Sequence, residues 1–137
     1  MTDAQTSSRI ATEVTADLTI YVVHPGDTPE TFDAVVAEPI VELLDTLKEA
    51  RAADPGLRCV LVHIDDGTVD EALSEALFEA IRAVCGSLTL ESAGTSGRIN
   101  LIRTSSMHDA ADTIQFLSSG AAGFVAGSTI DVRACAA

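Results

Sequence analysis

The sequence predicts an α/β domain in which a parallel sheet of about four strands is covered by helices on both faces. Short runs rich in Val, Ile and Leu alternate with longer stretches in which apolar residues recur every three or four positions. These are the patterns of strands and of amphipathic helices. The strand runs are apolar throughout rather than at every second residue, as expected when both faces of a sheet are buried. The resulting order is β-α-β-α-β-α-β, and right-handed crossovers place successive strands side by side.

The chain starts with a polar segment, residues 1–15, which we expect to be flexible or to form a short edge strand over residues 10–14. The domain itself is expected to span residues 16–134. Its first strand is Leu18–Val23, and the His-Pro-Gly sequence that follows is a stop signal for a strand.

The first helix is expected to have Thr28 as its N-cap and Pro29 at its first helical position. Pro39 interrupts the helical pattern and is expected to kink the helix or to remove one hydrogen bond. The apolar stripe of this helix consists of Phe32, Val35, Val36, Ile40, Leu43, Leu44 and Leu47.

A second, longer helix is expected after residue 67. Thr68 and Glu71 have the spacing of a capping box. Its apolar stripe consists of Ala72, Leu73, Ala76, Leu77, Ala80, Ile81, Val84 and Leu88. The other strands are expected at residues 59–64, 99–102 and 128–132. A short last helix is expected at residues 109–117.

Composition limits the function classes. The chain has 137 residues, of which 47% are apolar and 4% aromatic, which fits one domain with an aliphatic core. It carries 21 Asp and Glu against 8 Lys and Arg, a formal net charge of −13. Such a surface repels nucleic acid and anionic membranes. It is equally compatible with simple solubility and with adaptation to high salt. We expect a cytoplasmic protein, because neither a signal peptide nor an apolar run of about 20 residues is visible.

The three cysteines, Cys59, Cys85 and Cys135, have neither a disulfide framework nor zinc-ligand spacing. We expect the first two to be reduced core thiols and Cys135 to be exposed.

Two segments near the C-terminus resemble a known family. Residues 97–102 (Gly-Arg-Ile-Asn-Leu-Ile) and 116–132, which contain Phe-Leu-Ser-Ser-Gly-Ala-Ala-Gly and Ile-Asp-Val, are similar to the last two strands of short-chain dehydrogenases/reductases (SDRs). The resemblance extends over residues 17–133 and corresponds to the C-terminal half of such an enzyme. It implies a Rossmann-like three-layer sandwich.

The same resemblance implies that the catalytic positions are replaced. The catalytic asparagine corresponds to Pro39, the tyrosine to Ser74 and the lysine to Phe78, and no serine stands at the strand end, residues 63–65. In the family, the lysine stabilises the phenolate of the tyrosine that acts as acid and base. The family's glycine-rich cofactor loop has no counterpart either, since Gly120, Gly123 and Gly127 lead into a strand. We therefore expect no bound cofactor and no metal ion.

One group of polar residues remains a possible ligand site. The carboxyl ends of parallel strands share one edge of a sheet, where ligands bind in open α/β folds. Imidazoles and carboxylates at that edge are competent for metal binding or acid–base chemistry, but polar residues after strands are also common without a function. The residues expected there are His24, His63, Asp65, Asp66 and His108.

The function therefore stays open between two hypotheses. The favoured one is a non-catalytic SDR-like protein that works through a homodimer or through a full-length SDR-like partner subunit. The alternative is an NAD(P)-dependent oxidoreductase or small-ligand binder that completes its site with a partner chain. A strand at 18–23 would be a bare edge unless residues 10–14 or another chain covered it. Leu77, Phe78 and Ile81 lie where the resembled enzymes pair helices between subunits, so they either seal an old pocket or form an interface.

Overall fold

Five strands lie side by side in chain order and form one sheet. The computed structural model describes residues 9–15, 17–24, 31–123 and 125–133. The strands are β1 (Ile10–Thr15), β2 (Leu18–Val23), β3 (Arg58–Ile64), β4 (Arg98–Thr104) and β5 (Thr129–Asp131), in the order β1-β2-β3-β4-β5. Strands β2 to β5 run parallel, whereas β1 is antiparallel to β2. The predicted α/β fold class and the optional edge strand are both confirmed.

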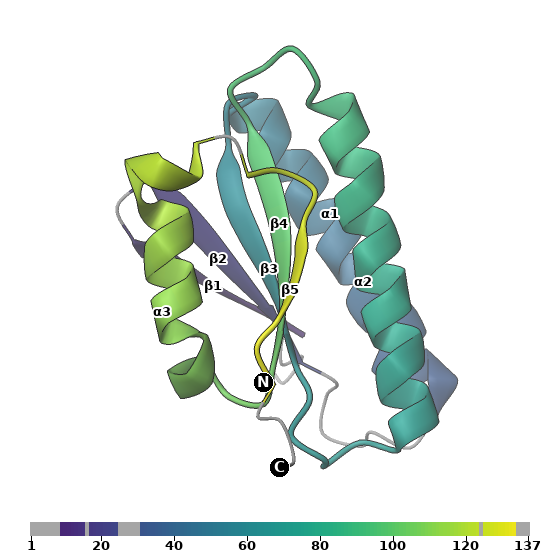
Figure 1. Cartoon of the computed structure of the whole chain (residues 1–137). Helices are drawn as coiled ribbons and strands as arrows, with labels where there is room; N and C mark the ends of the chain where they lie inside the picture. Colours follow the sequence, from purple (N-terminus) through teal and green to yellow (C-terminus); the bar gives the residue numbers. More distant parts are fainter. Residues whose placement is uncertain (1–8, 16, 25–30, 124, 134–137) are drawn as a thin grey trace, which may run out of the picture.

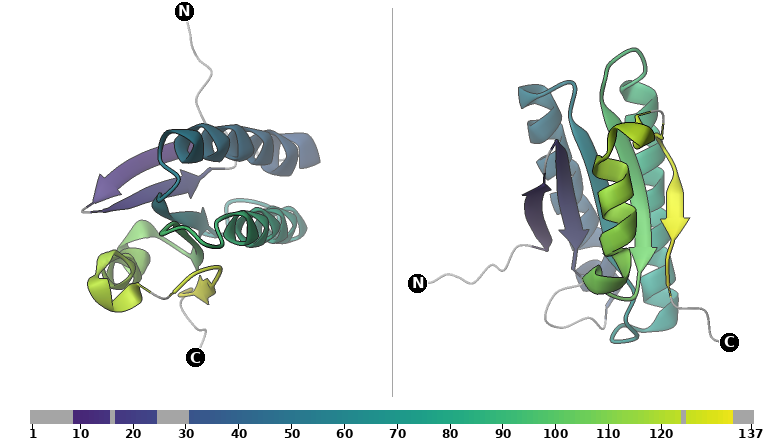
Figure 2. Two further views of the ribbon diagram at one scale, coloured as in Figure 1. Left: turned by 90° about the horizontal axis from the view of Figure 1, so that it is seen from above. Right: turned by 60° about the vertical axis from the view of Figure 1, so that its left-hand side comes forward.

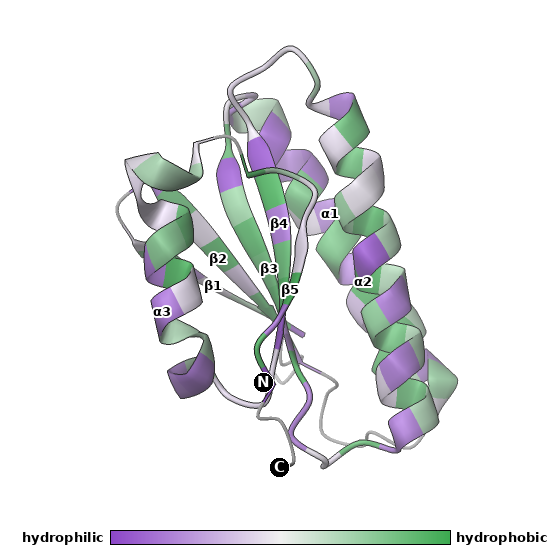
Figure 3. Ribbon diagram, viewed as in Figure 1, coloured by the Kyte–Doolittle hydropathy of each residue, from purple (hydrophilic) through white to green (hydrophobic). Residues whose placement is uncertain are grey.

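Helices cover both faces of the sheet. Helices α1 (Glu38–Ala53) and α2 (Glu71–Glu91) lie on one face, and α3 (Met107–Ser118) lies on the other (Figures 1 and 2). Because the strands are apolar on both sides, each face packs against its own layer of helix side chains. The strands β2, β3 and β4 are accordingly hydrophobic over most of their length, and hydrophilic residues concentrate on the outer sides of the helices (Figure 3).

Strand β1 covers the edge that β2 would otherwise expose. The pairing runs from Ile10 opposite Val23 to Thr15 opposite Leu18. Helix α1 fastens the start of this strand, because the Glu42 carboxylate accepts hydrogen bonds from the backbone N–H groups of Arg9 (2.9 Å) and Ile10 (3.2 Å). A second chain is therefore not required to cover β2, and the bare-edge argument for a dimer does not hold.

Pro39 marks a change in helical hydrogen bonding. A π-helical turn over Asp33–Ala37 runs directly into α1, and the Glu38 N–H donates to the Asp33 carbonyl. Pro39 thus lies in the first turn of α1, where a missing N–H is tolerated. The interruption expected at Pro39 is thus a change from π-helical to α-helical hydrogen bonding. The predicted start at Thr28 and Pro29 lies outside the described residues.

The predicted capping box of the second helix is wrong. The N-cap of α2 is Asp70, whose Oδ2 accepts hydrogen bonds from the N–H groups of Ala72 (3.1 Å) and Leu73 (3.3 Å). Thr68 instead donates its hydroxyl to Asp66, at 2.7 Å. A carboxylate directly before the helix satisfies two amides and complements the helix dipole, which a threonine two residues further away does not.

Cys59 and Cys85 are free, buried thiols, as predicted. Burial raises the pKa of Cys59 to about 12 and that of Cys85 to about 11, so neither is a reactive thiolate. Cys135 lies outside the described residues. None of the described helices is both long enough and apolar enough to cross a membrane.

Candidate functional site

The carboxyl ends of β3, β4 and β5 meet the first half of α2 in a group of interacting polar side chains. We call this group the strand-end cluster. It lies at the lower end of the sheet in Figure 1, where ligands bind in open parallel α/β folds. Its members are His63, Asp65, Ser74, Glu75, Phe78, Arg103, Asp131 and Arg133.

Arg103 is the centre of the cluster. Its side chain is only 6% exposed, because β4 places it under α2. The guanidinium donates from Nη2 to Asp65 Oδ2, at 3.1 Å, and to Glu75 Oε1. Its central carbon lies 4.2 Å from the centroid of the Phe78 ring. A desolvated cation over an aromatic face is worth up to about 2 kcal/mol, so three residues from two elements hold this side chain.

A second guanidinium extends the cluster to β5. Arg133 donates to Asp65 at 3.2 Å and to Asp131 at 2.6 Å. Asp65 therefore accepts from two arginines. Partial burial by itself would raise the pKa of Asp65, but the hydrogen bond and the charge of Arg103 outweigh burial and hold that pKa below its usual range. Asp65 is a fixed anion at neutral pH.

His63 is the buried neutral member. Its Nε2 lies 3.5 Å from the Ser74 hydroxyl, and its ring lies 5.9 Å from the Phe78 ring. Burial, followed by the charge of Arg103, lowers the pKa of His63 to about 4. The Nδ1 atom is buried and has no hydrogen-bond partner in the described part of the chain. The imidazole is therefore uncharged at neutral pH.

The Ser74–His63 contact does not amount to an activated nucleophile. A serine nucleophile needs a base that a third group orients through its other nitrogen. Here no carboxylate binds Nδ1 of His63, and Ser74 is 4% exposed. At 3.5 Å the contact is also at the long limit of a hydrogen bond. A substrate cannot reach this hydroxyl in the described conformation.

The five residues of the predicted ligand edge do not form one site. His63 and Asp65 belong to the strand-end cluster, while Asp66 faces Thr68 in the following turn. His24 and His108 are exposed. Over the described ranges, no group of three or more His, Cys, Asp or Glu side chains is arranged to hold a metal ion.

The structure brings together three of the positions that the SDR resemblance singled out. Ser74 and Phe78 contact His63, at the strand end where the family keeps its serine. Pro39 is buried in the first turn of α1. Leu77, Phe78 and Ile81 are 2%, 8% and 0% exposed within this single chain. All three side chains are therefore packed inside the chain rather than exposed for an interface.

Arg103 and Arg133 were missed by the sequence prediction. The partners of Arg103 are 28 and 38 residues away along the chain, and Arg133 reaches Asp65 over 68 residues, so no local motif predicts these ion pairs. The second partner of Arg133, Asp131, is only two residues away. The available signal was the arginine that follows an apolar strand run at 99–102 and remains inside the strand. A charged residue in such a place is buried only with partners of opposite charge.

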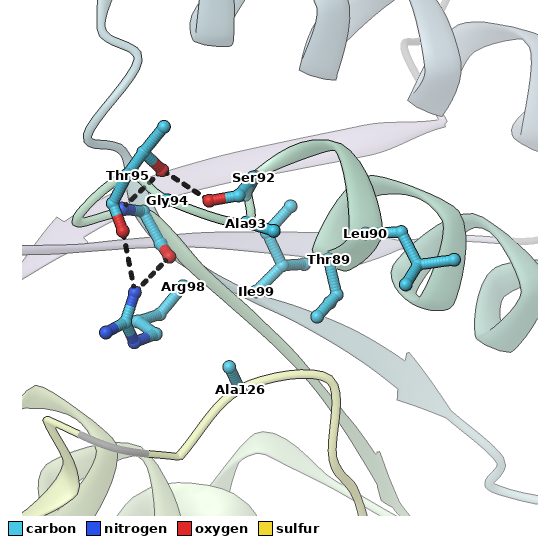
Figure 4. Close-up of a pocket in the computed structure, with 10 residues that line it drawn as sticks. Thr89, Leu90, Ser92, Ala93, Gly94, Thr95, Arg98, Ile99 and Ala126 are labelled. Atoms are coloured by element: carbon cyan, nitrogen blue, oxygen red, sulfur yellow. Dashed lines mark hydrogen bonds between the residues drawn. The ribbon is translucent and has the colours of Figure 1, made fainter.

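A separate pocket of about 610 Å³ lies at the opposite end of the sheet, where α2 ends (Figure 4). Among the described residues that line it, Arg98 is the charged one, and it donates from Nε and Nη1 to the carbonyls of Gly123, Thr95 and Gly97. Those bonds fix the loop between α2 and β4. The pocket also faces the carboxyl end of a helix dipole, which disfavours anions.

The starts of α2 and α3 do not fit a dinucleotide. A pyrophosphate binds to free N–H groups at a helix N-terminus. In α2 the amides of Ala72 and Leu73 are taken by the Asp70 carboxylate. In α3 the amide of Asp109 is taken by Ser106. Both starts also carry an acidic residue in the first turn, which repels phosphate.

A search of solved structures finds close similarities in fold. The chain superposes on enoyl-[acyl-carrier-protein] reductase (NADH) from Aquifex aeolicus VF5 with a TM-score of 0.67 and 17% identity, over 85% of this chain and 60% of that one. It superposes on a short chain dehydrogenase/reductase family protein with a TM-score of 0.63 and 17% identity, over 86% of this chain and 66% of that one. The chain has the SDR fold.

A third similar structure is angucycline C-6 ketoreductase LanV with bound NADP. It matches the SDR-like chain with a TM-score of 0.62 and 16% identity, over 78% of this chain and 54% of that one. The chain thus spans 54 to 66% of the lengths of these three proteins. No protein-family model matches the sequence, and a search of curated proteins finds no match. The resemblance seen in the sequence is confirmed for the fold.

Proposed function

We propose that this chain is a non-catalytic SDR-like protein that acts by associating with a second copy or with an SDR-like subunit. The observation that carries the proposal is the Arg103–Phe78 contact. The resemblance assigns the tyrosine and lysine positions to Ser74 and Phe78, and both side chains are buried. Arg103 covers Phe78 and is held there by Asp65 and Glu75.

Proton transfer is not supported at this place. A general acid or base needs a pKa near the working pH and access to the substrate. His63 has a pKa lowered to about 4 and is buried. The charged group that interacts with Ser74 is the Asp65 carboxylate, which disfavours an alkoxide, and the nearby Arg103 is already paired with two carboxylates. The cluster is therefore a structural ion-paired plug.

The second half of α2 offers a surface for association. Its exposed positions include Ala83, Gly86, Ser87 and Leu90, and Leu90 is 79% exposed. Glycine inside a helix costs about 1 kcal/mol relative to alanine. A Cβ on Gly86 would meet no atom within 4 Å, so packing inside the chain does not require glycine there. A glycine at this position would allow the backbone of another helix to approach α2 closely.

A second copy fits this surface. In an antiparallel pair of α2 helices that cross between residues 86 and 87, Leu90 faces Ala83 of the other copy, and Arg82 faces Glu91. The pair is self-complementary in size and in charge, as a two-fold interface must be. A shallow groove of about 230 Å³ between α1 and α2 borders the same surface, with Ala83, Ser87 and Lys48 among its lining residues.

The association can be tested with two matched variants. We expect sedimentation velocity at micromolar concentration to show a dimer, and Gly86→Glu to convert it to a monomer with an unchanged far-UV circular dichroism spectrum. Ala72→Glu adds the same charge at another exposed position of α2 and should leave the dimer intact. A wild-type chain that is monomeric alone and is recovered without an SDR-like subunit from its own cells would contradict the proposal.

The second candidate is an NAD(P)-dependent oxidoreductase or small-ligand binder that is completed by a partner chain. It is favoured by the similarity to LanV, a reductase solved with NADP bound. Such a protein would need its partner to supply the phosphate-binding amides, because the starts of α2 and α3 are already capped. Cofactor binding by the purified chain alone or by the mixed complex separates the two candidates.

A further inference from the structure

We propose that the outward side of the first half of α1, together with the π-helical turn before it, is a docking surface for a basic amphipathic helix of another protein. We call this surface the α1 face. It forms a groove of about 520 Å³ lined by Asp33, Ala37, Glu38, Val41, Glu42 and Asp45. The inference does not depend on the α2 dimer.

The α1 face has an apolar middle and acidic ends. Asp33, Ala37, Val41 and Asp45 follow one another at intervals of four residues, so they lie along one side of the helix. Val41 is 59% exposed, so the middle of the groove presents an apolar side chain to solvent. The neighbouring Phe32 is 56% exposed. From Asp33 to Asp45 the axial distance is about 18 Å at 1.5 Å per residue.

One cation of the chain already binds to this face. Arg9 Nη2 lies 3.0 Å from Glu38 Oε1, which shows that a guanidinium can bind in the groove. Glu42 is engaged with the backbone of β1. The carboxylates of Asp33 and Asp45 differ from these two, because neither has a hydrogen bond or an ion pair in the described part of the chain. They are the groups that remain for an external partner.

Charge decides what kind of partner fits. A second copy would place four carboxylates against four, and like charges across an interface are strongly unfavourable. Nucleic acid and anionic lipid are excluded for the same reason. An amphipathic helix of about twelve residues matches the groove if it carries Leu-like residues in its middle and a Lys or Arg near each end. Its apolar residues would cover Ala37 and Val41, and its cations would reach Asp33 and Asp45.

Exposed charges accelerate association more than they increase final affinity, and they are screened by salt. We therefore expect binding that is clearly salt-dependent. The probe is a fluorescent helical peptide of about twelve residues with Arg at both ends and Leu in the middle. The matched peptide has Glu in place of each Arg. Fluorescence anisotropy is measured with the full chain at 25 mM and 150 mM NaCl.

Three variants of exposed residues locate the binding. We expect Asp33→Asn with Asp45→Asn to weaken binding of the basic peptide at least tenfold, and Val41→Ser to weaken it several-fold. The control, Glu49→Gln with Asp112→Asn, removes the same charge elsewhere on exposed positions and should change binding less than twofold. The Glu peptide should not bind.

Three results would overturn the inference. The first is the absence of binding at 25 mM NaCl. The second is an equal loss of affinity in the control variant, which would show attraction to the overall charge alone. A change in sedimentation of the Asp33→Asn, Asp45→Asn variant without peptide would assign the face to a second copy and would also contradict it. Far-UV circular dichroism checks that each variant is folded.

Discussion

The Arg103 guanidinium lies over the face of the Phe78 ring, 4.2 Å from its centroid, at the place where the SDR resemblance expects a catalytic lysine. The positive charge next to Phe78 therefore belongs to Arg103 of β4 rather than to a residue of α2. It is balanced by Asp65 and Glu75 instead of being available to a reacting group. The cation over Phe78 is thus buried and already paired within the chain.

Replacing Arg103 with a residue of similar size should destabilise the fold. Arg103→Met removes the charge that compensates Asp65 and Glu75, and leaving carboxylates without their buried partner is costly. Because these carboxylates are 21% and 49% exposed, we expect a loss of about 2 kcal/mol in the free energy of unfolding, below the range for fully buried pairs. Urea denaturation measures it.

The control is Glu79→Gln, which breaks a surface ion pair without changing the proposed α2 contact. Arg82 pairs with Glu79 on the surface, and both side chains are more than half exposed. A surface pair of this kind contributes little, so the change should stay within about 0.5 kcal/mol. Equal effects of the two substitutions would mean that the strand-end cluster has no special structural role.

Stability should fall as the pH drops below about 6.5, because His63 is buried in its neutral form. Its pKa is lowered from 6.5 to about 4 in the folded chain, so the unfolded chain binds the additional proton between these values. The unfolded state is then favoured as the pH falls, and the total effect is about 3 kcal/mol. Below pH 4 the loss continues through Asp65, whose folded-state pKa is also lowered.

Two histidine variants check this pH dependence by urea denaturation at several pH values. His63→Phe should give a nearly constant stability between pH 6.5 and pH 4, apart from the contributions of exposed groups. His108→Ala, at an exposed position of α3, should keep the wild-type profile. If His63→Phe retained the full decrease, the buried imidazole would not be its source.

Asp70→Ala should lower the free energy of unfolding by about 1 kcal/mol. The two backbone N–H groups at the start of α2 that donate hydrogen bonds to the Asp70 carboxylate would lose their partner. Thr68→Ala removes only a hydroxyl that bonds to Asp66 and should cost less than about 0.5 kcal/mol. Thermal unfolding of both variants measures the difference. The reverse order would restore the capping box that the sequence pattern predicts.

Strand and helix positions were predictable because they depend on local patterns. The run at residues 59–64 is apolar except for His63 and became β3, with Val60 and Leu61 both fully buried on opposite faces. The pattern of α2 predicted its buried side, including Leu77 and Ile81. Local patterns did not determine the first residue of α2. Thr68 and Asp70 are both good N-caps, and only the path of the chain before the helix decides between them.

The strand-end cluster was only partly predictable for a physical reason. His63 and Asp65 could be placed at the carboxyl edge from strand direction alone. The grouping of all histidines there was too broad, because His24 and His108 point to solvent from the surrounding loop and helix start. The pairs of Arg103 with Asp65 and Glu75, and of Arg133 with Asp65, join residues far apart in the sequence, and such ion pairs leave no periodic signal.

The central claim is that the strand-end cluster is a structural plug rather than a cofactor-dependent active site. Titration calorimetry of the purified full chain with NADPH, and separately with NADH, tests it most directly. We expect no saturable binding below millimolar concentration with either cofactor. Binding with a Kd in the micromolar range, weakened by substitutions at Ser74 or His63 in variants that remain folded, would contradict the account.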